Sequence, residues 1–149
     1  MYKPISLSEY VRKRNGIALG ASGSMSNMLK RSLGANSFHL FWKYWNPIWG
    51  YYLSRNVMRP ISGILPLWLA VIVTFVVSGA LHDLAVSLVN LRFTFFFTPW
   101  FLLMSFIVLV TNKFGISYKE YQWPIRAAIN ITFIVICLIS TFALEQLYA

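Results

Sequence analysis

The chain has 149 residues, of which 58% are hydrophobic and 17% aromatic, while only 11% are charged. A soluble domain carries a much larger charged share, so this composition excludes an ordinary soluble domain and indicates a membrane protein. The formal net charge is +9, and nine of the 13 Lys and Arg residues precede residue 60. A basic arm of this kind can bind nucleic acid, but beside spanning helices an anionic lipid surface fits better. We therefore expect a lipid bilayer, and no nucleic acid, as its partner.

The first 36 residues contain no apolar run followed by a small-residue cleavage site, so we do not expect a cleaved signal peptide. Glycine and serine are frequent here, which predicts a flexible basic arm over residues 1–36 with at most short helices. Met25, Met28 and Leu29 lie next to Lys30, and such a group can form one turn of a helix at the lipid headgroup boundary. A disordered basic tail is an equally good interpretation of the same residues.

Aromatic side chains crowd the next segment, residues 37–60, where they alternate with Lys and Arg. Trp and Tyr rings prefer the membrane interface, so we expect this segment to lie on the bilayer or to enter it shallowly. Pro47 disfavours the α conformation for Asn46 and so marks a break in the segment. The pair then suits the N-cap and the first position of a new helix that runs to about Met58.

Three apolar runs follow, at residues 61–89, 93–110 and 125–144. About 20 apolar residues cross the hydrocarbon core of a bilayer, so each run is interpreted as a transmembrane helix. Pro99 lies in the second run, which predicts either a kink or a helix whose regular part begins only at Thr98 after an aromatic lead-in.

The predicted fold is therefore an all-α membrane protein, with interfacial N-terminal helices plus about three transmembrane helices in a membrane domain of residues 37–149. Arg92 is the one basic residue in the first loop between spans, whereas the N-terminal arm and the second loop carry more positive charge. The positive-inside rule then predicts a cytoplasmic N-terminus and a C-terminus outside. This orientation, without a signal peptide, suits a bacterial inner membrane.

Two ionisable residues, His82 and Asp83, lie within the first apolar run. A charged group at membrane depth costs several kcal/mol, so such residues are functional candidates by default. Ser78 and Gly79 lie one helical turn before His82, and their small side chains suit either a substrate chain or a closely packed helix. Asp83 is about 100° further round the helix axis, so we expect it to pair with a Lys or Arg elsewhere or to bind water near the outer surface.

The stretch FWKYWNPIWGYYL, followed by an apolar helix with SGALHD, resembles the signature region of the membrane-bound O-acyltransferases. Members of that family share a tryptophan-rich segment and a later helix with a buried histidine. The Trp45-Asn46 context is most similar to the branch that contains sterol and diacylglycerol acyltransferases and wax synthases. Asn46 and His82 are 36 residues apart, which is compatible with that branch. The likeness covers about residues 37–90.

The resemblance implies an O-acyltransferase in which His82 is the general base for an acceptor hydroxyl that attacks a thioester. The Asn46 amide would stabilise the developing oxyanion or hold the acceptor. The donor would be acyl-CoA, with no metal and no other cofactor. Contacts to the substrate are expected from Trp45, Trp49, Ser78 and Gly79, and contacts to the phosphates of CoA from Lys43, Arg55 and Arg59.

Structural roles also explain some of these residues. Asn46 suits a helix N-cap without any catalytic function. His39, among interfacial aromatic residues, is best interpreted as a surface side chain that reaches toward water. Polar residues of the third span, such as Asn130, are most simply helix-packing groups.

The chain is much shorter than full members of that family, which wrap many helices around a substrate tunnel. We therefore expect a second membrane subunit or a homo-oligomer to complete the site, unless the chain is a non-catalytic scaffold or assembly subunit. A different alternative is a three-helix membrane anchor that binds haem, for which His82 is the one histidine within a span.

Overall fold

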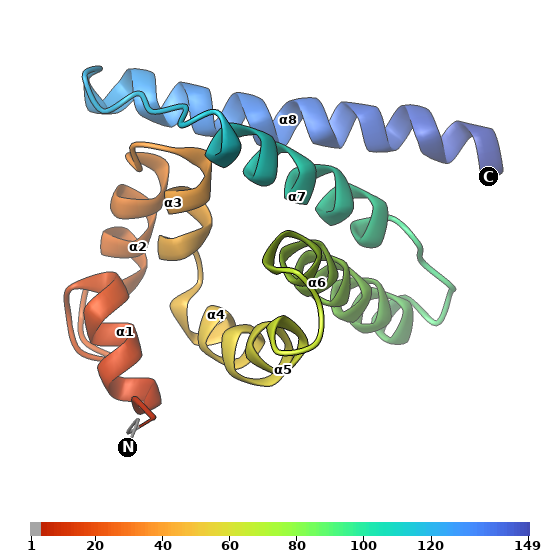
Figure 1. Ribbon diagram of the computed structural model, residues 1–149. Helices are drawn as coiled ribbons and strands as arrows, with labels where there is room; N and C mark the ends of the chain where they lie inside the picture. Colours follow the sequence, from red (N-terminus) through yellow and green to blue (C-terminus); the bar gives the residue numbers. More distant parts are fainter. Residues whose placement is uncertain (1–3) are drawn as a thin grey trace.

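The computed structural model describes residues 4–149, and within this range the regular structure is entirely helical, as the sequence predicts (Figure 1). The helices are, in chain order, α1 (Leu7–Asn15), α2 (Ser24–Leu33), α3 (Phe38–Tyr44), α4 (Pro47–Leu53), the single π-helical turn η1 (Ser54–Met58), α5 (Arg59–Ser62), α6 (Leu67–Asn90), α7 (Phe97–Lys113) and α8 (Trp123–Tyr148).

The N-terminal arm contains two helices that contact each other. Ser6 and Glu9 form a capping box at the start of α1, in which the Ser6 N–H donates to the Glu9 carboxylate at 2.8 Å. Asn15, only 3% exposed, then connects α1 to α2, because its Nδ2 donates to the Ser24 carbonyl at 3.1 Å and its own carbonyl accepts from Asn27 Nδ2. The single turn predicted around residues 25–29 is part of the ten-residue helix α2.

Asn130 in α8 holds the end of the arm. Its side chain is fully buried, and Nδ2 donates to the Leu33 carbonyl at 2.8 Å and to the Ala35 carbonyl at 3.1 Å. The Tyr118 hydroxyl donates to Asn130 Oδ1, and burial raises the pKa of Tyr118, so this hydroxyl keeps its proton. Asn130 was predicted to be a helix-packing group. In the structure it has a particular packing role, since it binds the backbone between α2 and α3 to α8.

The chain breaks between α3 and α4, as Pro47 predicts. Asn46 has a left-handed backbone (φ +40°), and its Oδ1 accepts a hydrogen bond from the Trp49 N–H at 3.2 Å. Pro47 is the first residue of α4, where a missing N–H costs nothing. The helical course continues past the predicted end at Met58, through η1 and α5 to Ser62.

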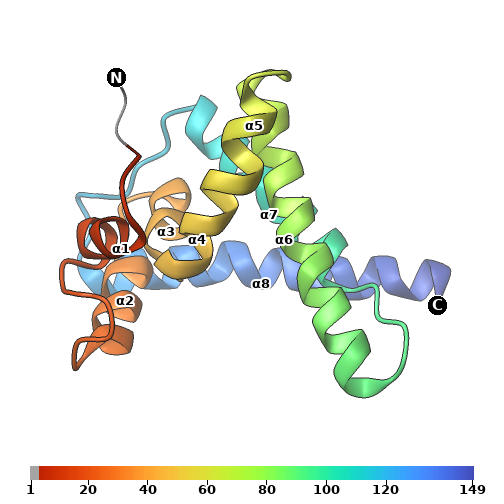
Figure 2. The ribbon, with the colours of Figure 1, turned by 90° about the horizontal axis from the view of Figure 1, so that it is seen from below.

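Two helices, α6 and α8, are long and apolar enough to cross a membrane. Only 22% of the most apolar window of each is buried within the protein, whereas the core helix of a soluble protein is mostly buried. The third predicted span is not confirmed by length, since α7 has 17 residues and begins at Phe97 after the expected aromatic lead-in. Figures 1 and 2 show that α6 crosses α8 and that α7 lies between them.

The hydrophobic core lies where α3 packs against α7 and α8. Phe38 and Phe41 of α3 are 0% and 2% exposed, and they contact Met104 and Val108 of α7 and Cys137 of α8. The aromatic helix α3 thus buries one face in protein. This packing fixes its other residues, which include the basic Lys43, relative to α6 and α7.

Candidate functional site

The Asp83 carboxylate holds the start of α7. Its Oδ1 accepts hydrogen bonds from the backbone N–H groups of Phe96 and Phe97, and its Oδ2 accepts one from that of Thr98, each at 2.8 Å. The Thr98 hydroxyl adds a fourth bond at 2.6 Å. The expectation that Asp83 pairs with a Lys or Arg or binds water is therefore wrong. A buried carboxylate is instead neutralised by helix N-terminal amides, which an anion favours.

Gly79 lets the same two helices approach closely. A Cβ atom placed there would lie 2.7 Å from the Phe97 carbonyl oxygen and 2.8 Å from the Thr98 Cα. The small residues before His82 were expected to accommodate either a substrate chain or a closely packed helix. At Gly79 the structure shows a closely packed helix. Gly79 and Asp83 together fix where α7 begins and hence where its aromatic side chains lie.

Those aromatic side chains surround His82. The imidazole centroid lies 5.6 Å from the ring of Phe97 and 5.1 Å from that of Phe101 on α7, and 6.0 Å from that of Trp49 on α4, whose plane is nearly perpendicular to it. The Nδ1 atom of His82 lies 2.6 Å from the Ser78 carbonyl oxygen. Because that oxygen can only accept, Nδ1 carries the proton, and in a neutral ring Nε2 is then the unprotonated nitrogen.

Asn46 is connected to His82 through two intervening residues. Asn46 caps the Trp49 N–H, and the Trp49 indole Nε1–H donates to Ser78 Oγ at 3.0 Å. Ser78 in turn holds His82 through its carbonyl oxygen. The Oδ1 atom of Asn46 is thus occupied by the cap, while its Nδ2–H groups make no hydrogen bond to residues 4–149 and can donate to another acceptor.

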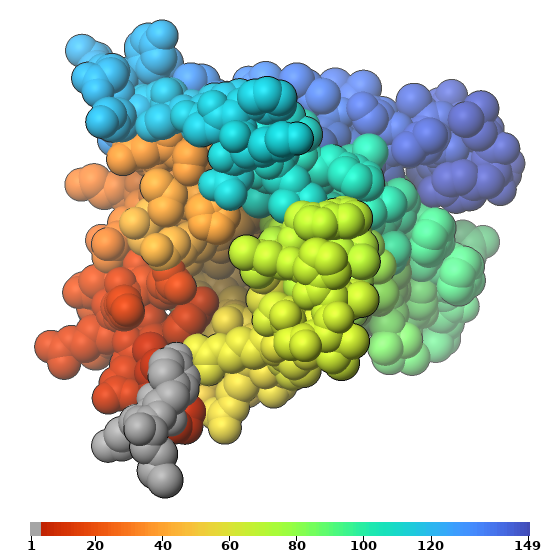
Figure 3. Space-filling model, viewed as in Figure 1, coloured from red at the N-terminus to blue at the C-terminus, as the bar shows by residue number. Residues whose placement is uncertain are grey.

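These residues line a cavity of about 430 Å³, a size within the ~300–1,000 Å³ typical of small-molecule sites. Figure 3 shows the molecule hollowed where α3, α4 and α6 meet. Exposed polar residues, among them Lys43 and Asn46, form the outer part of the lining, while Phe75, Phe101 and Val108 are half-buried or buried in its inner part. The cavity therefore combines an apolar interior with a polar rim.

The structure brings most of the predicted site residues to this cavity. His82, Asn46, Trp45, Trp49, Ser78 and Lys43 all line it. Gly79, Arg55 and Arg59 are not among the lining residues, and an Arg55 guanidinium nitrogen instead donates to the Tyr51 hydroxyl at 2.7 Å. Within residues 4–149, no group of three or more His, Cys, Asp or Glu side chains could hold a metal ion.

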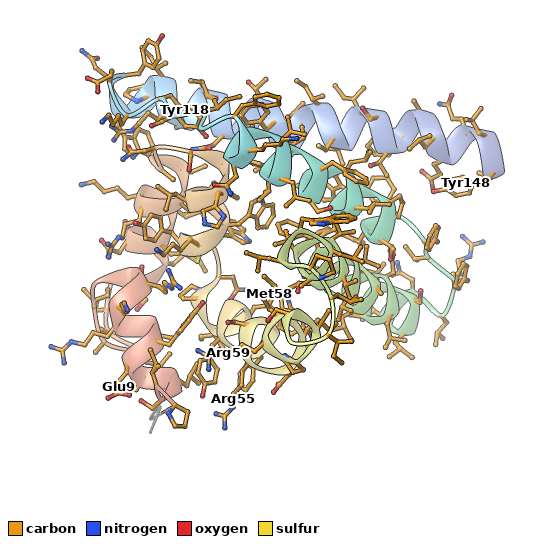
Figure 4. All side chains as sticks on the ribbon, viewed as in Figure 1. Glu9, Arg55, Met58, Arg59, Tyr118 and Tyr148 are labelled. Carbon is orange, nitrogen blue, oxygen red and sulfur yellow. The ribbon has the colours of Figure 1, made fainter. Side chains whose placement is uncertain are left out.

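Several lining residues were not found from the sequence. Tyr10 and Arg14 of α1 reach the cavity although they precede its other residues by more than 20 positions, and no local pattern marks them. His39 also lines the cavity, although its partial exposure agrees with the surface role predicted for it. Met58 of η1 lies on the inner side of the molecule, between α3, α4 and α6 (Figure 4). His39 could have been predicted as a lining residue, because it lies one helical turn before Lys43, which was expected to contact the substrate.

Comparisons of the whole chain with protein-family models, with curated proteins and with solved structures found no match. The likeness to the membrane-bound O-acyltransferases therefore depends on the residues quoted for it, above all Asn46, His82 and the tryptophans between them.

Proposed function

We propose that this chain is the catalytic part of a membrane-embedded O-acyltransferase. His82 takes the proton of an acceptor hydroxyl as its oxygen attacks the carbonyl carbon of a thioester, with acyl-CoA as donor. The tetrahedral intermediate then expels the thiolate, which receives the proton from His82. One ester bond forms, one thioester bond breaks, and no metal or redox partner takes part.

The observation that carries this proposal is the hydrogen bond of His82 Nδ1 to the Ser78 carbonyl. It fixes the tautomer whose Nε2 can accept a proton, on a residue that lines a cavity of suitable size. A core histidine with a structural role alone would gain nothing from a cavity beside it. The aromatic rings of Phe97 and Phe101 limit access of water to the imidazole.

Asn46 has two roles in this proposal. Its Oδ1 holds the N-terminus of α4 and thereby positions Trp49 against Ser78. Its Nδ2–H groups are available donors at the rim of the same cavity, where they would bind the substrate or the developing oxyanion.

The membrane arrangement belongs to the same proposal. We assign α7 as a third membrane-embedded helix beside the two that are long enough to span, with the N-terminus cytoplasmic, in a bacterial inner membrane. Large apolar side chains such as Leu88 of α6 and Ile139 of α8 are 67% and 62% exposed. Such surfaces need lipid or protein cover, which supports a second membrane subunit or further copies of this chain as the element that completes the site.

Release of free CoA thiol from acyl-CoA tests the proposal, with purified protein in detergent or liposomes and a membrane lipid extract as the source of acceptors. Wild type is compared with His82→Ala and with a mock preparation, and Glu120→Gln serves as a surface control because this side chain is 85% exposed. We expect turnover in wild type and in Glu120→Gln, and a loss of about 100-fold or more in His82→Ala.

Equal thiol release by His82→Ala and wild type would disprove the role of His82. No release above the mock preparation, with every co-purifying chain present, would favour a scaffold subunit. An absorption band of haem in the purified protein would favour the haem anchor instead.

A further inference from the structure

We propose that Arg14, His39 and Lys43 form a binding site for the phosphate group of an acyl-bearing amphiphile whose hydrocarbon chain occupies the inner part of the cavity. The site would bind the anionic end of the acyl donor. It rests on the proposed function only in that the apolar part of the ligand is taken to be an acyl chain.

Three basic side chains from two helices meet on this part of the lining. His39 and Lys43 lie one turn apart on α3, and Arg14 reaches the same cavity from α1. Arg14 is close enough to His39 that its charge, together with burial as the larger cause, lowers the pKa of His39. The guanidinium of Arg14 also stacks on the Tyr10 ring, 5.0 Å from the ring centroid.

No carboxylate of residues 4–149 balances these charges within the cavity. The chain has four acidic residues, none of them among the lining residues. Glu9 bonds to Ser6, Asp83 is occupied at α7, Glu120 lies 3.9 Å from Lys119, and Glu145 lies near the end of α8. Arg14 and Lys43 carry like charges on this lining without a counter-ion, and a bound anion would relieve their repulsion, while His39 adds a hydrogen-bonding imidazole.

Two N–H donors on the lining also lack a hydrogen-bond partner within the described residues. Arg14 Nε and Trp42 Nε1 are buried and make no hydrogen bond there. Because protein covers both of these atoms, a ligand in the cavity would bind Arg14 through the terminal N–H groups of its guanidinium and not through Nε. Phosphate oxygens are the acceptors that a guanidinium binds best.

The inner lining fits a hydrocarbon chain. Val71, Phe75, Phe101 and Val108 are apolar and half-buried or buried, and the half-buried Met58 also lines the cavity. A free phosphate would leave this surface empty, and a neutral lipid would leave the basic side chains without a partner. A phosphate joined to an acyl chain satisfies both parts of the cavity. Acyl-CoA and single-chain phospholipids share this chemistry.

Binding is measured with the full chain in a non-ionic detergent, by calorimetry. The probes are oleoyl lysophosphatidylglycerol, oleoyl-CoA, monooleoylglycerol as a neutral amphiphile with the same chain, CoA without an acyl group, and inorganic phosphate. The variants are Arg14→Gln and Lys43→Gln, with Arg12→Gln as the matched control, because Arg12 lies on the same helix and is exposed and not part of the lining.

We expect Arg14→Gln and Lys43→Gln each to weaken binding of an anionic amphiphile about tenfold, as loss of a charge-assisted hydrogen bond does. Binding of monooleoylglycerol should change less than about twofold, and Arg12→Gln should match wild type. The tighter of lysophosphatidylglycerol and oleoyl-CoA identifies the source of the phosphate. Equal loss in Arg12→Gln, equal loss for monooleoylglycerol, or equally tight binding of inorganic phosphate would overturn the proposal.

Failure of this inference is distinguishable from failure of the proposed function. Binding needs no turnover, so binding and thiol release are measured separately on the same wild-type protein. Charge-dependent binding without thiol release would support this site and refute catalysis. Thiol release that is unchanged in Arg14→Gln and Lys43→Gln would support catalysis and refute this site.

Discussion

Asp83 and Thr98 are joined by two hydrogen bonds, because Asp83 Oδ2 accepts from both the Thr98 backbone N–H at 2.8 Å and the Thr98 hydroxyl at 2.6 Å. The carboxylate therefore determines where α7 begins, and α7 carries two of the rings around His82. A carboxylate in the apolar helix α6, about two turns before its end at Asn90, would otherwise cost several kcal/mol. Its role at α7 explains it without a catalytic function.

The first prediction concerns Asp83→Asn. An amide keeps the shape of the side chain, but its NH₂ group cannot accept a hydrogen bond, so at least one backbone N–H at the start of α7 loses its acceptor. We expect a loss of about 2–4 kcal/mol in the free energy of unfolding, measured by circular dichroism during titration of the detergent-solubilised protein with dodecyl sulfate. Glu120→Gln is the control and should change stability by less than about 0.5 kcal/mol. Unchanged stability in Asp83→Asn would contradict this role.

The second prediction concerns Asn130→Ala. The substitution leaves the carbonyl oxygens of Leu33 and Ala35 and the Tyr118 hydroxyl without their partner in a fully buried position. We expect unfolding to be easier by about 2–4 kcal/mol, together with faster proteolysis between α2 and α3. Asn112→Ala, at an exposed position of α7, is the matched control. Protease resistance equal to wild type would show that the arm is held by other contacts.

The local parts of this structure were predictable from the sequence. The break at Asn46 and the start of α4 follow from Pro47, whose ring restricts its own backbone and that of the residue before it. The apolar length of α6 and α8 follows equally from sequence alone. In each case the cause lies within a few residues, or within a single helix.

The remaining parts depend on how distant segments meet. The partners of Asp83 are backbone amides 13 to 15 residues later, and backbone N–H groups leave no mark in a sequence. Arg14 reaches the cavity only because α1 packs beside α4, and no side-chain pattern in α1 reveals this. For the same reason Lys43, and not Arg55 or Arg59, is the predicted phosphate contact that lines the cavity.

The third prediction concerns Trp49→Phe, which removes the hydrogen bond to Ser78 Oγ but keeps an aromatic ring beside His82. Trp49 acts as a positioning residue, so we expect kcat for thiol release to fall about 3- to 10-fold while binding of the anionic amphiphile changes less than about twofold. Trp68→Phe, at a position 56% exposed near the start of α6, is the control. A purely structural role would instead lower stability and binding together.

The fourth prediction concerns pH. Burial and then the charge of Arg14 lower the pKa of His39 below its ordinary value of 6.5, so His39 is neutral at pH 7. A bound phosphodiester opposes the effect of Arg14 and raises the pKa of His39, so binding takes up protons and affinity should rise as the pH falls from about 7.5 to about 5.5. The other ionisable groups that line the cavity with His39 are Arg14, Lys43 and Tyr10, besides His82.

Lysophosphatidylglycerol is the suitable probe for this prediction, because a phosphodiester keeps its charge over the whole range. His39→Gln should make its affinity independent of pH, whereas His82→Gln should leave the pH dependence in place. Stability without ligand should change with pH in the opposite direction to affinity. His39 takes up a proton at a higher pH in the unfolded chain than in the folded one, so the free energy of unfolding falls as the pH drops through about 6.5. An affinity that is flat with pH in wild type would contradict the position of His39 in the site.

The last prediction concerns the part of the cavity lined by Met58, which lies between α3, α4 and α6 (Figure 4). Met58 belongs to the π-helical turn η1, and its sulfur lies 3.4 Å from the Thr74 hydroxyl of α6. A single π turn within an α-helical course shifts the side chains that follow it, and such turns are frequent at functional sites. Here the turn places a flexible, apolar side chain where the hydrocarbon chain of the ligand would lie.

We expect Met58→Trp to reduce the cavity volume and so to weaken binding of oleoyl lysophosphatidylglycerol about tenfold or more, while a lauroyl analogue loses less than about threefold, because only the longer chain needs the inner space. Met25→Trp is the control, since Met25 is 67% exposed on α2 and is not one of the lining residues. Equal losses for the two chain lengths would mean that Met58 does not border the hydrocarbon chain. In the expected result, Met58 controls the preference for chain length and Arg14 controls the preference for charge. The two ends of one ligand are then assigned independently.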